Sequence, residues 1–138
     1  MANVITYGTF DLFHIGHLRL LERAKRLAGP GGTLTVVVSS DLFNRKEKGK
    51  VCTIPDVHRM EIVAALRCVD RVLPETCWEQ KRRDIIDNDI DIFVMGDDWK
   101  GKFDDLSDIC RVVYLPRTPD VSSTELKNSL RDLREEKK

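Results

Sequence analysis

Short runs of apolar, β-branched residues alternate with segments of helical periodicity along this chain, and this alternation limits its fold more than any other feature. Strands are expected at residues 4–7, 33–38, 69–73, 92–95 and 111–115, and helices at 19–27, from Pro55 onward, at 78–88 and at 123–134, with a short helical turn at 106–109. Parallel strands need crossover connections, which the helices supply. The pattern therefore predicts an α/β, Rossmann-like three-layer sandwich with a five-stranded parallel sheet.

The length and the charge balance limit the classes of function. With 138 residues, the chain is expected to form a single domain over residues 1–138, in which the charged end at 131–138 is a frayed helix end. Lys and Arg number 23 and so do Asp and Glu, so no overall positive field favours nucleic acid or an acidic membrane surface. No run of about 18 apolar residues predicts membrane insertion, and the first residues, MANVITYGTF, lack the pattern of a signal peptide.

The four cysteines carry little functional signal. Cys52, Cys68, Cys77 and Cys110 match neither paired zinc-ligand spacing nor a redox CxxC motif. We expect free thiols, and we expect the protein in a reducing cytoplasm.

The segment after the first expected strand, residues 8–17 (GTFDLFHIGH), concentrates chemistry. Gly8 permits a tight turn, and Gly16 has no Cβ, so a phosphate can approach the backbone where a helix begins. In a first helical turn, His14 and His17 project to the same side and could both donate hydrogen bonds to one triphosphate. A zinc pair is the rival interpretation, and it lacks an evident third ligand.

A second polar segment, residues 117–124 (RTPDVSST), precedes the last expected helix. Ser122 and Glu125 match the S-x-x-E capping box, which gathers hydroxyl and N–H groups at a positive helix end suited to phosphates. Arg117 adds a fixed positive charge with forked donors. Taken alone, the segment equally fits an ordinary capped helix that follows a surface arginine.

These motifs are similar to those of a known superfamily. TYGTFDLFHIGH (residues 6–17) resembles the HxGH nucleotidyltransferases, and WEQK (78–81), FVMGDDW (93–99) and YLPRTP (114–119) resemble the glycerol-3-phosphate cytidylyltransferase family over residues 4–126. The resemblance implies CTP and sn-glycerol 3-phosphate as substrates, CDP-glycerol and pyrophosphate as products, Mg²⁺ with the CTP, a homodimer, and a role in teichoic acid or capsule synthesis. Residues 121–124 read VSST where the family often has ISTT, so the hydroxyl is retained.

The resemblance also implies roles for individual residues. The catalytic residues implied are His14, His17, Lys48 and Arg117. The residues implied to bind CTP are Gly8, Thr9, Phe10, Asp11, His14, Gly16, His17, Arg67, Asp98, Arg117, Thr118, Val121, Ser122, Ser123 and Thr124. Lys48, Arg59 and Lys81 are implied to bind the acceptor, and Asp11 to meet Mg²⁺ held mainly by the CTP phosphates, or to orient His14.

Some of these assignments stay open. The lysine of the expected mobile loop at residues 45–50 is Lys48, with Lys46 and Lys50 as alternatives. Arg59 and Arg67 are expected on one helix, where eight-residue spacing could turn both toward one cleft. An adenylyltransferase acting on another phosphorylated acceptor and a non-catalytic nucleotide-sensing module remain as alternative functions, because HxGH and Arg-Thr motifs recognise phosphates and not bases.

Overall fold

The five strands expected from the sequence form one parallel sheet. The structure is a computed structural model in which residues 1–117 are described. The strand order is β3-β2-β1-β4-β5. The strands are β1 (Asn3–Gly8), β2 (Thr33–Ser39), β3 (Arg71–Glu75), β4 (Ile92–Gly96) and β5 (Arg111–Leu115). In the register, Thr6 of β1 lies between Val36 of β2 and Val94 of β4.

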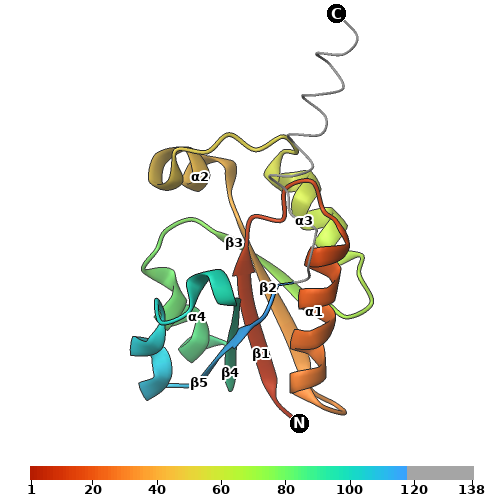
Figure 1. The fold of residues 1–138 in the computed structure, drawn as a ribbon, viewed down its shortest axis with the longest axis vertical. Helices are drawn as coiled ribbons and strands as arrows, with labels where there is room; N and C mark the ends of the chain where they lie inside the picture. Colours follow the sequence, from red (N-terminus) through yellow and green to blue (C-terminus); the bar gives the residue numbers. More distant parts are fainter. Residues whose placement is uncertain (118–138) are drawn as a thin grey trace, which may run out of the picture.

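Helices cover both faces of this sheet (Figure 1). They are α1 (Ile15–Ala28), α2 (Asp41–Lys48), α3 (Asp56–Ala64) and α4 (Gln80–Asp87), with 3₁₀ helices η1 (Asp97–Trp99) and η2 (Asp104–Asp108). Helices α1 and α3 lie on one face, and α4 with η2 lies on the other. The predicted Rossmann-like three-layer α/β class is therefore confirmed.

Alternation of side chains along the strands divides the core in two. Val4 of β1 packs in the cluster under α1 and α3, whereas its neighbour Ile5 packs in the cluster under α4 and η2. Leu21 of α1 and Ile85 of α4 close the two clusters from opposite sides. Burial on both faces explains why the strand segments read as nearly continuous apolar runs.

The structure corrects three expectations about local structure. Residues 45–48, expected in a mobile loop, form the second half of α2, which Ser40 caps by accepting the Phe43 N–H at 3.1 Å. The third strand begins and ends two residues later than expected, at Arg71–Glu75. Helix α3 ends at Ala64, so Arg67 lies in the turn that follows and not on the helix with Arg59. The helix expected at 123–134 and the tail at 131–138 lie outside the described residues.

The order of the strands determines where a ligand can bind. The chain passes from β1 outward through β2 to β3 and then returns to the opposite side of β1 with β4. In parallel α/β sheets, the crevice beyond the carboxyl ends of strands at such a reversal is the usual binding site. Here that position is the junction of β1 and β4, followed by the GTFDLFHIGH and GDDW segments.

Candidate active site

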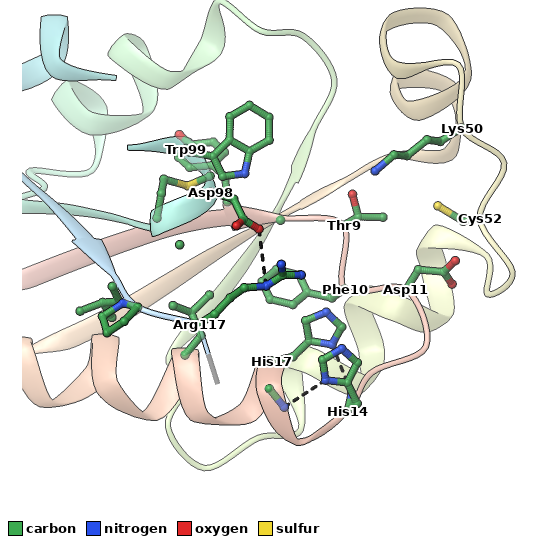
Figure 2. A pocket seen from close by; sticks show the side chains of 18 of the residues that line it. Thr9, Phe10, Asp11, His14, His17, Lys50, Cys52, Asp98, Trp99 and Arg117 are labelled. Carbon is green, nitrogen blue, oxygen red and sulfur yellow. Dashed lines mark hydrogen bonds and ion pairs between the residues drawn. The ribbon is translucent and has the colours of Figure 1, made fainter. Parts of the chain in front are cut away.

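A cavity of about 550 Å³ lies beyond the carboxyl ends of β1 and β4 (Figure 2). Nine of the residues predicted to bind CTP line it: Gly8, Thr9, Phe10, Asp11, His14, Gly16, His17, Asp98 and Arg117. The tertiary structure therefore brings the GTFDLFHIGH segment, the residues after β4 and the residues after β5 to one hollow. The predicted contacts at Thr118, Val121, Ser122, Ser123 and Thr124 lie outside the described residues.

A second cavity of about 310 Å³ adjoins the first. Five residues line this cavity and not the larger one: Lys48, Glu75, Trp78, Lys81 and Phe103. Both cavities share the residues Tyr7, Gly8, Thr9, Lys50, Met95 and Trp99. One site can therefore hold a large ligand and a smaller ligand side by side over the end of β1.

His14 and His17 cap helix α1 and each other. The His14 Nδ1 accepts the Gly16 N–H at 3.0 Å, and the His17 Nδ1 accepts the His14 N–H at 3.1 Å. The two rings stack with centroids 3.9 Å apart. Because each Nδ1 is an acceptor, each neutral ring carries its proton on Nε2. The i, i+3 spacing predicted a shared side of the helix, but it did not reveal this reciprocal histidine capping box.

The electrostatic state of His17 follows from its surroundings. Burial, reinforced by the adjacent His14 ring and opposed by Asp11, lowers the pKa of His17 to about 4. In the free protein at neutral pH, this ring is therefore a neutral hydrogen-bond donor and not a cation. A bound polyanion would favour its protonated form.

This pKa predicts how stability depends on pH. The unfolded chain protonates His17 near pH 6.5, whereas the folded chain does so near pH 4, so the contribution is present above pH 6.5 and is lost as pH falls toward 4. Between pH 7 and pH 5, we expect this histidine to lower the free energy of unfolding by roughly 2 kcal/mol. Urea unfolding of His17→Gln, which keeps an acceptor for the cap, should show a correspondingly smaller pH dependence; an equal dependence would contradict the prediction.

The loop between β1 and α1 holds an unusual backbone. Phe10 and Leu12 have φ angles of 55° and 50°, in the left-handed region that non-glycine residues rarely adopt. A Cβ on Gly8 would lie 2.8 Å from the Phe10 ring, so the glycine is needed for close packing of this ring rather than for the predicted turn. Backbone strain of this kind is concentrated at functional sites.

Asp11 joins this loop to the segment before α3. Its carboxylate accepts the Thr53 N–H at 2.8 Å, the Ile54 N–H at 2.9 Å and the Leu12 N–H at 3.1 Å. No group of three metal-ligating side chains occurs among residues 1–117. These residues do not fit a protein-held magnesium site, because within this range Asp11 has no group of further ligands around it and its carboxylate already accepts three backbone N–H groups. The Asp11 contact with Mg²⁺ predicted from the resemblance gains no support from this geometry.

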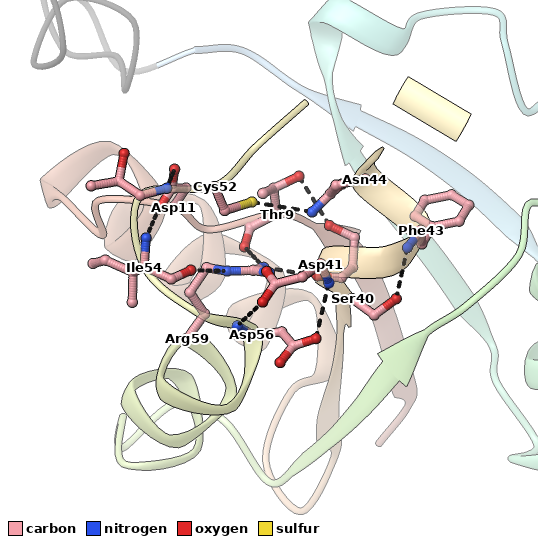
Figure 3. Close-up of polar contacts among 12 residues, drawn as sticks. Thr9, Asp11, Ser40, Asp41, Phe43, Asn44, Cys52, Ile54, Asp56 and Arg59 are labelled. Carbon is pink, nitrogen blue, oxygen red and sulfur yellow. Dashed lines mark hydrogen bonds and ion pairs between the residues drawn. The ribbon is translucent and has the colours of Figure 1, made fainter. Parts of the chain in front are cut away.

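Arg59, predicted to bind the acceptor, lies at the centre of the polar contacts between the β1–α1 loop, the end of β2 and the segment before α3 (Figure 3). Arg59 is 1% exposed, and its guanidinium donates to the carbonyls of Thr9, Ser39 and Ile54 at 2.7–2.8 Å. It also pairs with Asp41 Oδ1 at 2.7 Å. The predicted contact of Arg59 with the acceptor gains no support from this geometry, because the guanidinium holds three chain segments together and Arg59 lines neither cavity.

The two remaining predicted cations beside CTP differ in position. Arg117 lines the larger cavity and lies 3.7 Å from Asp98, with both side chains 60% exposed (Figure 2). An exposed pair of this kind is weak, so Arg117 can exchange Asp98 for a phosphate.

Arg67 is exposed in the turn after α3 and lines neither cavity. Its predicted contact with CTP has no support in this geometry, because α3 ends before reaching it.

The three alternatives for the loop lysine are separated by the structure. Lys46 is exposed on α2 and lines neither cavity, whereas Lys50 lines both. Lys48 lines the smaller cavity, with its Nζ 5.2 Å from the Phe43 ring and 5.5 Å from the Trp78 ring. Burial, with help from the neighbouring cations Lys50 and Lys81, lowers the pKa of Lys48 against the effect of Glu75.

The fold and the site together define a nucleotidyltransferase, in which two histidines and an arginine line a cavity at the reversal of a parallel sheet. The profile of the cytidylyltransferase-like family matches residues 5–129. A solved structure of the lipopolysaccharide core biosynthesis protein from Thermoplasma volcanium shares this fold, with a TM-score of 0.73, 27% identity, and coverage of 86% of this chain and 98% of that chain.

Two relatives show which group within the cytidylyltransferase-like family this chain resembles. The glycerol-3-phosphate cytidylyltransferase of Bacillus subtilis (strain 168) is 54% identical over 96% of this chain and its own whole length. That of Staphylococcus aureus is 45% identical over 94% of this chain and 96% of the relative. The chain therefore belongs to the cytidylyltransferase-like family and, within it, to the glycerol-3-phosphate cytidylyltransferases. The resemblance inferred from the motifs is confirmed.

Proposed function

We propose that this protein transfers the cytidylyl group of CTP to sn-glycerol 3-phosphate and releases CDP-glycerol and pyrophosphate. The observation that carries this proposal is the meeting of His14, His17 and Arg117 around one cavity, which adjoins a smaller cavity lined by lysines. The larger cavity suits a nucleotide and the smaller one suits a three-carbon phosphate. The names of the full-length relatives support the choice of substrates.

The proposed reaction is an in-line displacement at the α-phosphorus of CTP. An oxygen of the acceptor phosphate forms the new bond, and the bond to the pyrophosphate oxygen breaks. The attacking oxygen is already ionised near neutral pH, so no general base or covalent nucleophile is needed. The protein must align the two phosphates and offset their crowded negative charge.

The described residues can divide this task. The Nε2–H groups of His14 and His17 would donate to the triphosphate, and Arg117 would leave Asp98 to meet it. Asp98, released from Arg117, would accept from the cytosine amino group or the ribose. Lys48 and Lys50 would bring positive charge to the junction of the two cavities. Mg²⁺ is proposed to enter as the magnesium complex of CTP, with the triphosphate as its ligand.

A crossed panel of nucleotides and acceptors tests the proposal. CTP and ATP would each be incubated with sn-glycerol 3-phosphate, choline phosphate and ribitol 5-phosphate, with pyrophosphate release and product mass measured. We expect CDP-glycerol from one combination at a rate far above the others. Turnover with ATP would favour an adenylyltransferase. CTP binding without pyrophosphate from any acceptor would favour a nucleotide-sensing module.

The lysine assignment predicts a contrast between two variants. Lys48→Met should lower kcat/KM for the acceptor by at least roughly tenfold, because a charge facing two phosphates is removed from a half-buried position. Lys46→Met is the matched control, since Lys46 is exposed two residues away and lines neither cavity. Equal kinetics for the two variants in steady-state assays would refute the role of Lys48.

A homodimer is also part of the proposal, on the basis of the family resemblance. Exposed apolar side chains support it: Val51 is 80% exposed before α3, and Val57 and Ile62 on α3 are 69% and 40% exposed. Light scattering after size exclusion should give about twice the 15.8 kDa of one chain. Val57→Asp combined with Ile62→Asp should shift the protein toward one chain, and a monomeric wild type would contradict the prediction.

The remaining inferences concern the setting of the reaction. No helix within residues 1–117 has the length and apolarity to cross a membrane. We infer a cytoplasmic location because CTP is a cytoplasmic metabolite, and a single domain over residues 1–138. The product would supply activated glycerol phosphate for a teichoic acid or capsule polymer.

A further inference from the structure

A buried ion pair forms one wall of the smaller cavity. The Lys81 Nζ of α4 lies 2.6 Å from the Glu75 Oε2 at the end of β3, with side-chain exposures of 7% and 3%. Both residues line the cavity. Among residues 1–117, the Glu75 carboxylate accepts a hydrogen bond from Lys81 through Oε2, and its Oε1 has no hydrogen-bond partner. Glu75 as a whole is 2% exposed. Because Glu75 lines the cavity, this oxygen can accept a hydrogen bond from a ligand there.

Aromatic rings hold the ammonium of this pair in place. The Lys81 Nζ lies 4.8 Å from the Tyr7 ring centroid, 5.1 Å from that of Trp78 and 5.4 Å from that of Phe103. Tyr7 is itself anchored, because its hydroxyl donates to Asp84 Oδ2 at 2.6 Å. The ammonium therefore has a fixed position, in contrast to a flexible surface lysine.

The charge of Lys81 is already compensated, which changes what it can recognise. A close ammonium–carboxylate pair has no net charge, so it attracts a phosphate much less than a free cation does. Lys48 and Lys50 line the same cavity and form no ion pair within 4 Å among the described residues. Phosphate charge is therefore better met by these two lysines, at the side of the cavity that adjoins the larger one.

We propose that the Glu75–Lys81 pair recognises the hydroxyl groups of the acceptor and so selects a polyol phosphate, while Lys48 and Lys50 meet its phosphate. One hydroxyl donates to the free Oε1 of Glu75, and a neighbouring hydroxyl accepts from an N–H of Lys81. An adjacent donor and acceptor match a vicinal diol, which has the same two functions on adjacent carbons. This inference rests on the proposed function and reassigns Lys81, which the resemblance placed at the acceptor phosphate.

The test compares two acceptors in the full chain. sn-Glycerol 3-phosphate carries the diol, and n-propyl phosphate lacks both hydroxyls at the same carbon length. With CTP as the donor, we expect the wild type to prefer the diol by at least roughly a hundredfold in kcat/KM, because buried polar groups left unpaired penalise the analogue. A preference below threefold would overturn the inference. No nucleotidyl product from either acceptor would instead refute the proposed function.

Two variants assign this preference to the pair. Glu75→Leu combined with Lys81→Met replaces a buried ion pair by apolar groups of similar size, a change that folded proteins often tolerate. We expect its preference for the diol to fall below about threefold, whereas the KM for CTP stays close to that of the wild type. Retention of the full preference would overturn the inference.

The single variant Glu75→Gln covers the case in which the double variant does not fold. Its oxygen should face Lys81, which turns an NH₂ group toward the cavity in place of the free acceptor. We expect its preference to fall by at least tenfold, and an unchanged preference would overturn the inference. Glu79→Gln is the matched control, because Glu79 is exposed and lines neither cavity, and its preference should equal that of the wild type.

Discussion

Alanine in place of either His14 or His17 is expected to lower kcat by roughly a hundredfold or more, which corresponds to about 3 kcal/mol of lost transition-state stabilisation. The physical reason is the orientation of the rings. Each Nδ1 accepts a backbone N–H, so the hydrogen-bond donor of each neutral ring is its Nε2–H, and both histidines line the cavity. Pyrophosphate release at saturating CTP and acceptor is the measurement. Near-normal turnover in both single variants would defeat the assignment of these residues to catalysis.

A second variant separates the chemistry from the capping of α1. His14 is the N-cap of this helix, so its alanine variant should also lose about 1 kcal/mol of stability. Asparagine is a favoured N-cap residue with a shorter side chain. His14→Asn should therefore unfold at nearly the wild-type urea concentration and still lose turnover. Full activity in this variant would show that capping, and not donation from Nε2, is the function of the ring.

Replacing Arg59 by methionine is expected to destabilise the protein by at least about 3 kcal/mol. The change leaves three carbonyl groups without a donor, at Thr9, Ser39 and Ile54, and it leaves Asp41 without its cation. The midpoint of urea unfolding, followed by circular dichroism, is the measurement.

Arg67→Met is the matched control for stability, since Arg67 is exposed in the turn after the same helix. It should change the free energy of unfolding by less than about 0.5 kcal/mol. Similar destabilisation by the two variants would contradict the role of Arg59 at the centre of these polar contacts. The KM of Arg67→Met for CTP separately tests the nucleotide contact that the resemblance implied for this residue.

Local patterns predicted the strands better than the short helices. The strand at 111–115 was predicted at its observed bounds because its apolar run is continuous and ends at a proline. Helix α2 was missed because its eight residues, DLFNRKEK, include only two apolar side chains, Leu42 and Phe43, which are too few to form a recognisable apolar stripe. The Ser40 N-cap and Gly49, which has a φ of 61° at the C-terminal end, were the available signals.

The two arginines show a different limit of sequence reasoning. Arg59 and Arg67 have the same residue type and a spacing compatible with one helix face, yet one is buried and the other exposed. Where a helix ends and which carbonyls surround a side chain depend on packing between distant segments. The spacing within one segment does not contain that information.

The sequence by itself determined the α/β class, the HxGH and Arg117 motifs and the family, because these depend on local alternation and on residue types in fixed order. Only the three-dimensional structure showed three further properties. His14 and His17 form a reciprocal capping box, Arg59 binds backbone carbonyls inside the protein, and the charge of Lys81 is compensated by an ion pair with Glu75. Each of these properties depends on which groups lie within hydrogen-bonding distance and how much water reaches them. For Arg59, chain segments far apart in sequence set both conditions when they pack together, whereas the histidine bonds and the Glu75–Lys81 pair are short-range contacts whose side-chain geometry the sequence pattern does not specify.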